Sequence, residues 1–488
     1  MATILLKRKD VIVGRKREQK LLEKAYKSKE AEFITLYGRR RVGKTFLIRE
    51  FFGNKKCIFF HVTGVQNGTL EQQLKKFSSV VSQTFLIDED LETPRNWNDA
   101  FSLLQRQAAK TKGKVVIFLD ELPWLATKKS YLLSELDYFW NRHWSGMRNI
   151  ILIVCGSSAS WLIQKIIYNK GGLHNRTTCR IPLQPFNLHE TDLYLKSKGM
   201  KLNQKQVLSL YMALGGIPYY LNYVEAGLSA EQNIQNLMFQ KHSLMNDEYS
   251  VLFDSLFENA DSYREIIEQI AQKREGIERR ELDALPTITK SGGRLSQRLK
   301  DLVSTGFIEE FTPWGRARGE YYKIVDEYTI FYLHWVQTKA KKVTSDFWIM
   351  QSQRPAYYAW AGYAFEAICM KHVEQIIKAL KIPAKEVGSW RYVSPRKAPD
   401  YGAQVDLVID RWDSALNLCE IKYTAQPFIL DKKCAEKLKK TTELFRKRTK
   451  TDKQIILSLV SASGVKKTIY LEDMINGTVT LKDLFVQL

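Results

Sequence analysis

The chain has 488 residues, and Lys and Arg outnumber Asp and Glu by 75 to 53, which gives a formal charge of +22. This length predicts several domains, because single domains usually span about 100–200 residues. The 44% hydrophobic content suits packed cores and argues against long disordered tracts. The positive charge favours a polyanionic partner, most simply nucleic acid, with a solvated lysine-rich surface as the alternative.

The six cysteines are scattered and include no C-x-x-C pair. This pattern argues against a zinc ribbon or a disulfide framework and is typical of reduced thiols. The apolar run after Met1 is too short for a signal peptide. No uninterrupted apolar stretch approaches the ~18 residues of a membrane span. We therefore expect a cytoplasmic protein with no membrane partner.

In the first third of the chain, short apolar runs alternate with helical patterns. The runs predicted to be strands are Phe33–Tyr37, Lys114–Leu119 and Asn149–Cys155. Strands separated by helical stretches predict a parallel sheet with helices on both faces. From about Pro185 to Ala260 the pattern is helical.

The segment after the first predicted strand, Gly38–Thr45, matches G-x-x-x-x-G-K-[ST] at every fixed position and precedes a predicted helix. Gly38 and Gly43 let backbone N–H groups turn toward phosphates, and a helix N-terminus favours anions. Lys44 is placed to reach the β- and γ-phosphates, and the Thr45 hydroxyl is placed to bind Mg²⁺. The motif therefore predicts a nucleotide·Mg²⁺ site.

Polar residues that follow the other two strands are candidates for the same site. Asp120 and Glu121 end the second strand, beside the crevice where parallel sheets bind ligands. Asp120 would hold Mg²⁺, and Glu121 would orient or deprotonate the attacking water. The alternative is an acidic pair favoured by a helix dipole.

Two further candidates are weaker. Ser157 follows the third strand and would contact the γ-phosphate or the water, unless it only forms a Gly-Ser turn. Arg176 is a candidate cationic sensor or arginine finger, with a surface arginine as the alternative.

Residues 261–342 change in character. Helical patterns at Tyr263–Lys273 and Gly293–Val303 flank a short third segment, Glu278–Leu285. Two strand patterns follow, at Gly306–Phe311 and Tyr321–Val325. Three helices and a hairpin are the order of a winged helix-turn-helix. Such a unit would either bind DNA or only connect domains. A Lys-rich exit linker is expected at 339–342, and the candidate recognition helix carries Arg294, Gln297, Arg298 and Lys300.

Four segments together resemble a known family. They are Val13–Arg15, the phosphate loop, the strand ending in Asp120–Glu121, and Gly215–Pro218. They look like the archaeal and bacterial ATPases of the STAND division of AAA+-related NTPases, and the resemblance covers nearly the whole chain. It implies that ATP is the nucleotide and that Gly14, Arg15 and Pro218 border the adenine. As bare residues, Gly14 and Pro218 are a turn residue and a helix breaker.

The last part, from about Pro355, reads as a helix over Tyr363–Leu380, three strands, a basic helix and a strand. Glu420 and Lys422 share one face of a predicted strand, because residues i and i+2 point the same way. With Asp406 of the neighbouring strand, two carboxylates and the Ile421 carbonyl would suit a hard cation such as Mg²⁺. Lys422 would position a water nucleophile or stabilise transition-state charge.

This constellation looks like the PD-(D/E)XK nuclease superfamily. The resemblance implies that Asp406, Glu420 and Lys422 act in catalysis and that Glu366, on the opening helix, is an accessory metal ligand. The alternative is a strand-end residue and a solvated strand face. From Asp431 to Lys453, ten Lys and Arg oppose four Asp and Glu, which suits a nucleic-acid backbone or a solvated helix.

The predicted fold class is α/β. We predict a P-loop ATPase core (1–184), a helical lid (185–260), a winged helix-turn-helix (261–342) and a nuclease-like domain (355–488). The cofactors are ATP and Mg²⁺, and the partners are nucleic acid, with DNA favoured over RNA, and a second copy of the chain. Three functions stay open: an ATP-regulated protein that binds or cleaves nucleic acid, a non-enzymatic ATP-switched scaffold, and a regulator acting through the winged helix.

Overall fold

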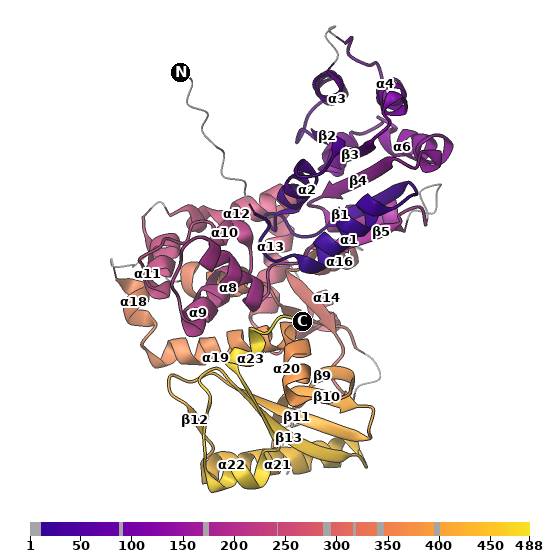
Figure 1. The fold of residues 1–488 in the computed structure, drawn as a ribbon. Coiled ribbons are helices and arrows are strands. Elements are labelled where there is room, and N and C mark those ends of the chain that lie inside the picture. Colours follow the sequence, from indigo (N-terminus) through magenta and orange to yellow (C-terminus); the bar gives the residue numbers. More distant parts are fainter. Residues whose placement is uncertain are drawn as a thin grey trace. The chain divides into compact units, whose positions relative to one another are not determined.

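The computed structural model describes residues 11–86, 91–168, 175–241, 243–285, 294–315, 319–338, 346–394 and 401–488. Its contacts divide the chain into two units, Met1–Pro185 with Leu299–Gly306, and Phe186–Arg298 with Phe307–Leu488. The predicted α/β class with a parallel central sheet is confirmed, and an additional sheet lies in the C-terminal part (Figure 1). The four predicted domain limits stay a prediction.

The first unit is built on a five-stranded sheet in the order β2-β3-β4-β1-β5, and every pair is parallel. The three apolar runs are strands as predicted, whereas the sequence did not reveal β2 and β5. Both are edge strands, and neither is buried along its whole length, so neither is apolar from end to end. The strands are β1 (Glu32–Tyr37), β2 (Cys57–Thr63), β3 (Lys114–Asp120), β4 (Ile150–Gly156) and β5 (Cys179–Pro182).

Helices complete this unit, and two of them begin at a residue whose side chain caps the first turn. Thr69 forms a capping box with Gln72 at α3, and Asn96 accepts from the Asp99 N–H at α4, which satisfies amides that a helix start leaves unpaired. The helices are α1 (Lys16–Lys27), α2 (Lys44–Gly53), α3 (Leu70–Phe85), α4 (Trp97–Lys110), α5 (Leu122–Leu125), α6 (Leu132–Arg142), η1 (Trp144–Gly146), α7 (Ala159–Leu162) and η2 (Ile163–Ile167).

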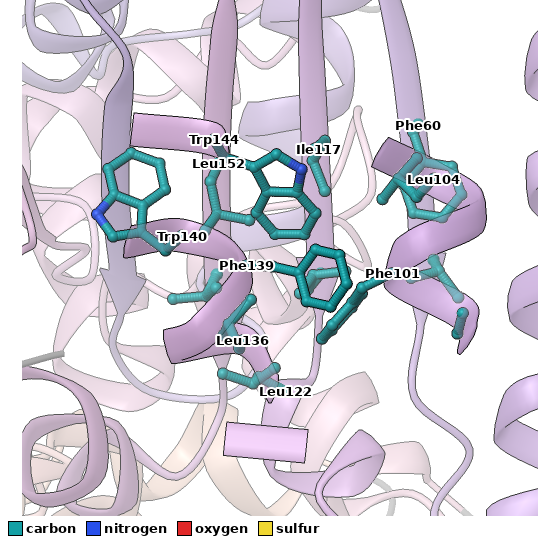
Figure 2. Packing of buried hydrophobic residues seen from close by; sticks show 14 of the residues in the cluster. Phe60, Phe101, Leu104, Ile117, Leu122, Leu136, Phe139, Trp140, Trp144 and Leu152 are labelled. Atoms are coloured by element: carbon teal, nitrogen blue, oxygen red, sulfur yellow. The ribbon is translucent and has the colours of Figure 1, made fainter. Parts of the chain in front are cut away.

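An aromatic cluster forms the core on one face of this sheet. Figure 2 shows Phe101 of α4 close to Phe139 of α6 and Trp144 of η1. The ring centroid of Phe101 lies 5.6 Å from that of Phe139 and 5.5 Å from that of Trp144. Both distances are within the range of favourable aromatic pairs. These helices thereby hold β3 and β4, whose carboxyl ends carry the predicted acidic and hydroxyl residues.

The second unit begins with the helical segment that the sequence predicts. Asn187, Asn203 and Ser229 each form a capping box at a helix start. A Cβ on Gly216 would lie 1.8 Å from the Phe186 carbonyl oxygen, so only glycine permits this close backbone approach. The elements are α8 (Leu188–Ser197), α9 (Gln204–Leu214), α10 (Pro218–Leu221), α11 (Ala230–Ile234), η3 (Gln235–Phe239) and α12 (Leu244–Leu256).

A small antiparallel sheet follows, in the order β6-β8-β7. The predicted hairpin is confirmed as β7 and β8, and β6 extends it. The predicted exit linker at 339–342 lies outside the described residues. The elements are α13 (Ala260–Ala271), β6 (Ile277–Glu278), α14 (Arg279–Asp283), α16 (Arg294–Ser304), β7 (Ile308–Phe311), β8 (Tyr321–Ile324), α17 (Glu327–Phe331), η4 (Tyr332–Val336) and α18 (Phe347–Gln351).

The C-terminal sheet has the order β15-β13-β11-β10-β9. The strands from β9 to β11 are antiparallel, and β11, β13 and β15 are parallel. The elements are α19 (Pro355–Lys371), α20 (Val373–Leu380), β9 (Ala384–Tyr392), β10 (Ala403–Arg411), β11 (Ala415–Lys422), β12 (Phe428–Ile429), α21 (Lys432–Thr449), β13 (Gln454–Ser461), β14 (Val465–Lys466), α22 (Ile469–Met474), β15 (Gly477–Thr480) and α23 (Leu481–Leu484). None of the described helices is both long and apolar enough to cross a membrane.

The predicted helix over Tyr363–Leu380 is wrong in two respects, because the helical segment begins at Pro355 and because two helices, α19 and α20, meet at His372. The His372 Nε2 accepts from the Leu188 N–H at 3.0 Å, and its Nδ1 donates to the Ile368 carbonyl at 2.8 Å. These bonds require the neutral ring, with the proton on Nδ1. Burial lowers the pKa of His372 to about 4.

The buried neutral ring of His372 predicts that the free energy of unfolding depends on pH. Between pH 6.5 and 4 the unfolded chain binds a proton that the folded chain excludes, so stability falls as the pH is lowered through this window. From pH 7 to pH 5 the loss attributable to His372 is roughly 2 kcal/mol. Urea unfolding of His372→Gln should show a smaller pH dependence than that of the wild type between pH 7 and pH 5. An equal pH dependence in the variant and the wild type would contradict the assignment.

Candidate functional site

The predicted phosphate loop joins β1 to α2 and curls around the side chain of Lys44. Gly38 and Gly43 have φ angles of 150° and 92°, in the region that glycine favours. A Cβ on Gly38 would lie 2.2 Å from the Leu183 carbonyl oxygen. The Lys44 Nζ donates to the carbonyls of Gly38 at 2.9 Å and Arg39 at 3.0 Å. The loop therefore holds the lysine in its centre.

Lys44 is 6% exposed, and its burial has an electrostatic effect. Burial lowers the pKa of Lys44, while Cys155, Glu121 and Asp120 act in the opposite direction. A buried cation that only neutral carbonyls contact is poorly compensated. An anionic phosphate in the loop would provide the compensation that the two carbonyls do not.

Asp120, at the end of β3, is the centre of a hydrogen-bond network. Its carboxylate accepts from Thr45 Oγ1 at 2.8 Å, from Cys155 Sγ at 2.7 Å and from Thr63 Oγ1 at 3.4 Å. His61 Nε2 lies 3.5 Å from the same carboxylate. Burial alone would raise the pKa of Asp120, but the bonds from His61, Cys155 and Thr45 lower it below its ordinary value. The group is therefore an anion at neutral pH.

Sequence reasoning missed His61, Thr63 and Cys155 as neighbours of this carboxylate. His61 and Thr63 lie on β2, which the sequence did not reveal as a strand, although β2 pairs with β3 so that Thr63 is opposite Asp120. The available signal was a polar residue at the carboxyl end of a half-buried strand.

Glu121 and Ser157 form the second pair at this edge of the sheet. The Glu121 carboxylate accepts from the Ser157 N–H at 2.9 Å and from its hydroxyl at 3.0 Å. Glu121 also has a φ of 48°, a left-handed conformation that costs free energy in a non-glycine residue. Ser157 therefore fixes where the carboxylate points, a contact that the sequence did not indicate.

The other predicted nucleotide residues are placed differently. The guanidinium of Arg15 is buried and donates to the carbonyls of Gln184 at 2.6 Å and Val42 at 3.1 Å. Gly14 precedes it with a φ of 67°. Arg176 is exposed, and Pro218 is the first residue of α10, in the second unit. The structure brings together Lys44, Thr45, Asp120, Glu121 and Ser157.

This donor set fits a nucleotide-bound Mg²⁺. The ion prefers hard oxygen ligands and usually takes one or two from the protein, with the rest from phosphates and water. The Thr45 hydroxyl and the Asp120 carboxylate are 2.8 Å apart and are ligands of this kind. Within the described ranges, no group of three His, Cys, Asp or Glu side chains could hold a metal ion by itself.

A second group of charges lies where β10 and β11 separate. The register of β9 and β10 shifts between Val405 and Val408, and such irregularities re-aim side chains. Asp406 lies in this stretch, and its carboxylate accepts from the Ile421 N–H at 3.0 Å and from Gln404 at 3.2 Å. The Lys422 ammonium donates to Glu420.

Glu366 of α19 joins this acidic cluster, which consists of Glu366, Asp406 and Glu420 with Lys422. Burial, with Asp406 and Glu420 adding to it, raises the pKa of Glu366 to about 8. Burial and Glu420 raise the pKa of Asp406 to about 6. Crowded carboxylates in a poorly hydrated place disfavour each other's charge, so a cation among them would be stabilised.

The fit of a metal to the acidic cluster is partial. Its carboxylate oxygens are the ligands that Mg²⁺ prefers. However, Asp406 also accepts a backbone N–H, and Glu420 is paired with Lys422. None of the three-residue groups among the described residues is arranged to hold a metal. These carboxylates would have to turn to bind one.

The predicted basic helix is α21, and it presents much of its charge to solvent. Its Arg448 lies over the Tyr392 ring of β9, with the guanidinium carbon 4.2 Å from the ring centroid. Phe445 and Leu444 bury the opposite face against Trp390. The exposed basic residues of the helix are Lys432, Lys433, Lys437, Lys439, Lys440, Arg446, Lys447 and Arg448.

Residues 12–224 match a family described as an ATPase domain predominantly from Archaea. An uncharacterised protein of Methanocaldococcus jannaschii is 26% identical over 404 residues, which cover 82% of this chain and 84% of that protein. An uncharacterised ATP-binding protein of the same organism is 52% identical over 46 residues, which cover 9% of this chain and 78% of that protein.

Two solved structures are similar at lower identity. A Walker-type ATPase of Pyrococcus abyssi has 19% identity and a TM-score of 0.46, with 66% of this chain and 96% of that chain covered. The ORC2 protein of Aeropyrum pernix has 12% identity and a TM-score of 0.43, with 75% and 97% covered.

Proposed function

We propose that this chain, whose residues 12–224 match an ATPase domain predominantly from Archaea, hydrolyses ATP and acts on nucleic acid through its C-terminal half. The observation that carries the first part is the Thr45–Asp120 hydrogen bond of 2.8 Å beside a loop filled by Lys44. This bond joins the two groups proposed to bind Mg²⁺, beside a buried lysine that donates to two backbone carbonyls.

Each residue has a proposed role in hydrolysis. The amides after Gly38 and up to Gly43 cradle the phosphates, and Lys44 exchanges its carbonyl contacts for the β- and γ-phosphates. Bound Mg²⁺, held by Thr45 and Asp120, would neutralise developing phosphate charge. Glu121 orients the attacking water as a general base.

Ser157 and the outlying residues have supporting roles. Ser157 positions the Glu121 carboxylate through two hydrogen bonds, and Arg176 is the proposed cationic sensor. Gly14, Arg15 and Pro218 are proposed to border the adenine. Because the Arg15 guanidinium binds two backbone carbonyls, its main chain is the part we assign to the adenine.

Lys44→Ala should abolish ATP binding, because it removes the cation at the phosphates. Glu121→Gln should bind ATP normally but lose hydrolysis, because the amide cannot accept the proton of the water. Nucleotide binding by calorimetry and phosphate release measure the two effects. The exposed Lys75→Ala and Glu71→Gln variants on α3 serve as matched controls. Wild-type hydrolysis by Glu121→Gln would remove Glu121 from its role.

Nucleic acid is the proposed partner of α21 rather than of the predicted recognition helix. Eight basic residues of α21 are exposed. In the predicted winged segment, by contrast, Arg298 is buried and lies over the Tyr263 ring. The Trp314 N–H after β7 donates to the Ser389 carbonyl of β9. These contacts favour a connecting role for that segment, and DNA stays the favoured substrate over RNA.

DNA affinity should fall with salt, and neutralising Lys439, Lys440, Arg446 and Lys447 to glutamine should flatten the log–log slope. Each lost phosphate contact reduces the slope by roughly 0.9. Fluorescence anisotropy with a labelled duplex measures the affinity at each salt concentration. A control variant removes four exposed charges from the first unit and should keep the wild-type slope. Its positions are Lys75, Lys76, Lys110 and Lys112. Equal slopes in the two variants would place the surface elsewhere.

The acidic cluster makes metal-dependent cleavage the proposed action on that nucleic acid, with a binding-only scaffold as the second candidate. Asp406→Asn should abolish cleavage in Mg²⁺ or Mn²⁺, because it removes a charged ligand. Lys422→Ala should slow it by about 10²–10³, as for the loss of one oxyanion donor. The exposed Asp413→Asn variant is the control, and ATP hydrolysis should be unchanged in all three. If the wild type cuts neither DNA nor RNA in any nucleotide state, the scaffold is the better reading.

A further inference from the structure

The turn between α13 and β6 lies beside the acidic cluster. The guanidinium carbon of Arg274, in this turn, is 5.6 Å from the centroid of the Tyr363 ring. Tyr363 precedes Glu366 by three residues on α19, so the two side chains share one face of the helix. A cation from the predicted winged segment thus stands at the border of a group of carboxylates from the C-terminal domain.

Two ion pairs and a close approach at Gly276 fix this turn against its surroundings. Glu275 pairs with Arg391 of β9. Gly276 has a φ of 99°, and a Cβ there would lie 2.8 Å from the Phe311 ring. Lys273, on the other side of Arg274, pairs with Glu281 of α14. The ordered backbone therefore presents the two neighbouring cations to different partners, Lys273 to α14 and Arg274 to α19.

Two cations border the acidic cluster. The Arg274 guanidinium lies over the Tyr363 ring, three residues before Glu366 on α19. Lys422 lies inside the cluster, where it pairs with Glu420. Arg274 is an exposed residue and acts from the border. Two cations at different depths flank the same carboxylates, an arrangement that suits a chain of phosphates rather than one anion.

We propose that Arg274 is a positioning residue of the acidic cluster that binds a backbone phosphate neighbouring the one at Lys422. This inference rests on the proposed binding of nucleic acid by the C-terminal half. Arginine matches phosphate because its planar fork donates two parallel hydrogen bonds. Stacking on Tyr363 holds the side chain before the phosphate arrives, which reduces the ordering cost of binding. The phosphodiester site is thus shared between two predicted domains.

The test compares Arg274→Gln with Lys273→Gln, which removes the same charge one residue away. A labelled DNA duplex is titrated at several salt concentrations, with an RNA duplex of the same sequence as a second arm. We expect the log–log slope to fall by roughly 0.9 in Arg274→Gln only. Arg274→Lys should restore the slope but bind several-fold more weakly than wild type, because lysine lacks the fork.

The outcomes separate this inference from the function on which it rests. Equal slopes for Arg274→Gln and Lys273→Gln, with wild-type binding intact, overturn the role of Arg274 alone. A wild-type chain that binds neither duplex overturns both proposals. If Arg274→Gln does not fold, Arg274→Lys decides, because an affinity equal to that of wild type would exclude the bidentate phosphate contact.

Discussion

The hydrogen bonds that converge on Asp120 connect the parts of the nucleotide site. This carboxylate joins the start of α2 through Thr45, the end of β2 through Thr63 and the end of β4 through Cys155. Three separate chain segments thus meet at one anion in a poorly hydrated place, where hydrogen bonds are strong and unpaired groups are costly. The aromatic core around Phe101 supports β3 and β4 from one face, which keeps their polar ends in register.

The acidic cluster of the C-terminal half has electrostatic surroundings opposite to those of Asp120. Asp120 is surrounded by donors that lower its pKa, whereas burial and neighbouring carboxylates raise the pKa of Glu366 and Asp406. The first arrangement holds a charge that is ready for a cation. The second leaves carboxylates that favour a proton until a cation or a rearrangement compensates them.

Strong local patterns made much of this architecture predictable. Gly38–Thr45 and the apolar strand before Asp120 specify their own conformation, and so does the hairpin of β7 and β8. What escaped prediction depends on distant partners. His61 and Thr63 interrupt the apolar pattern of β2, so their positions beside Asp120 follow only from strand pairing. The break at His372 depends on the Leu188 N–H, 184 residues away.

The polar contacts at the C-terminal end of α19 also bear on whether the chain can be divided into fragments that fold on their own. Residues that the sequence assigns to separate domains share polar partners: His372 with Leu188, and Lys371 with Glu327. A fragment that ends before Pro355 would leave the Leu188 amide and the Glu327 carboxylate without these partners, and stranded buried polar groups destabilise a fold. A cut just before Pro355 would therefore destabilise the described residues on both sides of it instead of releasing two independent domains.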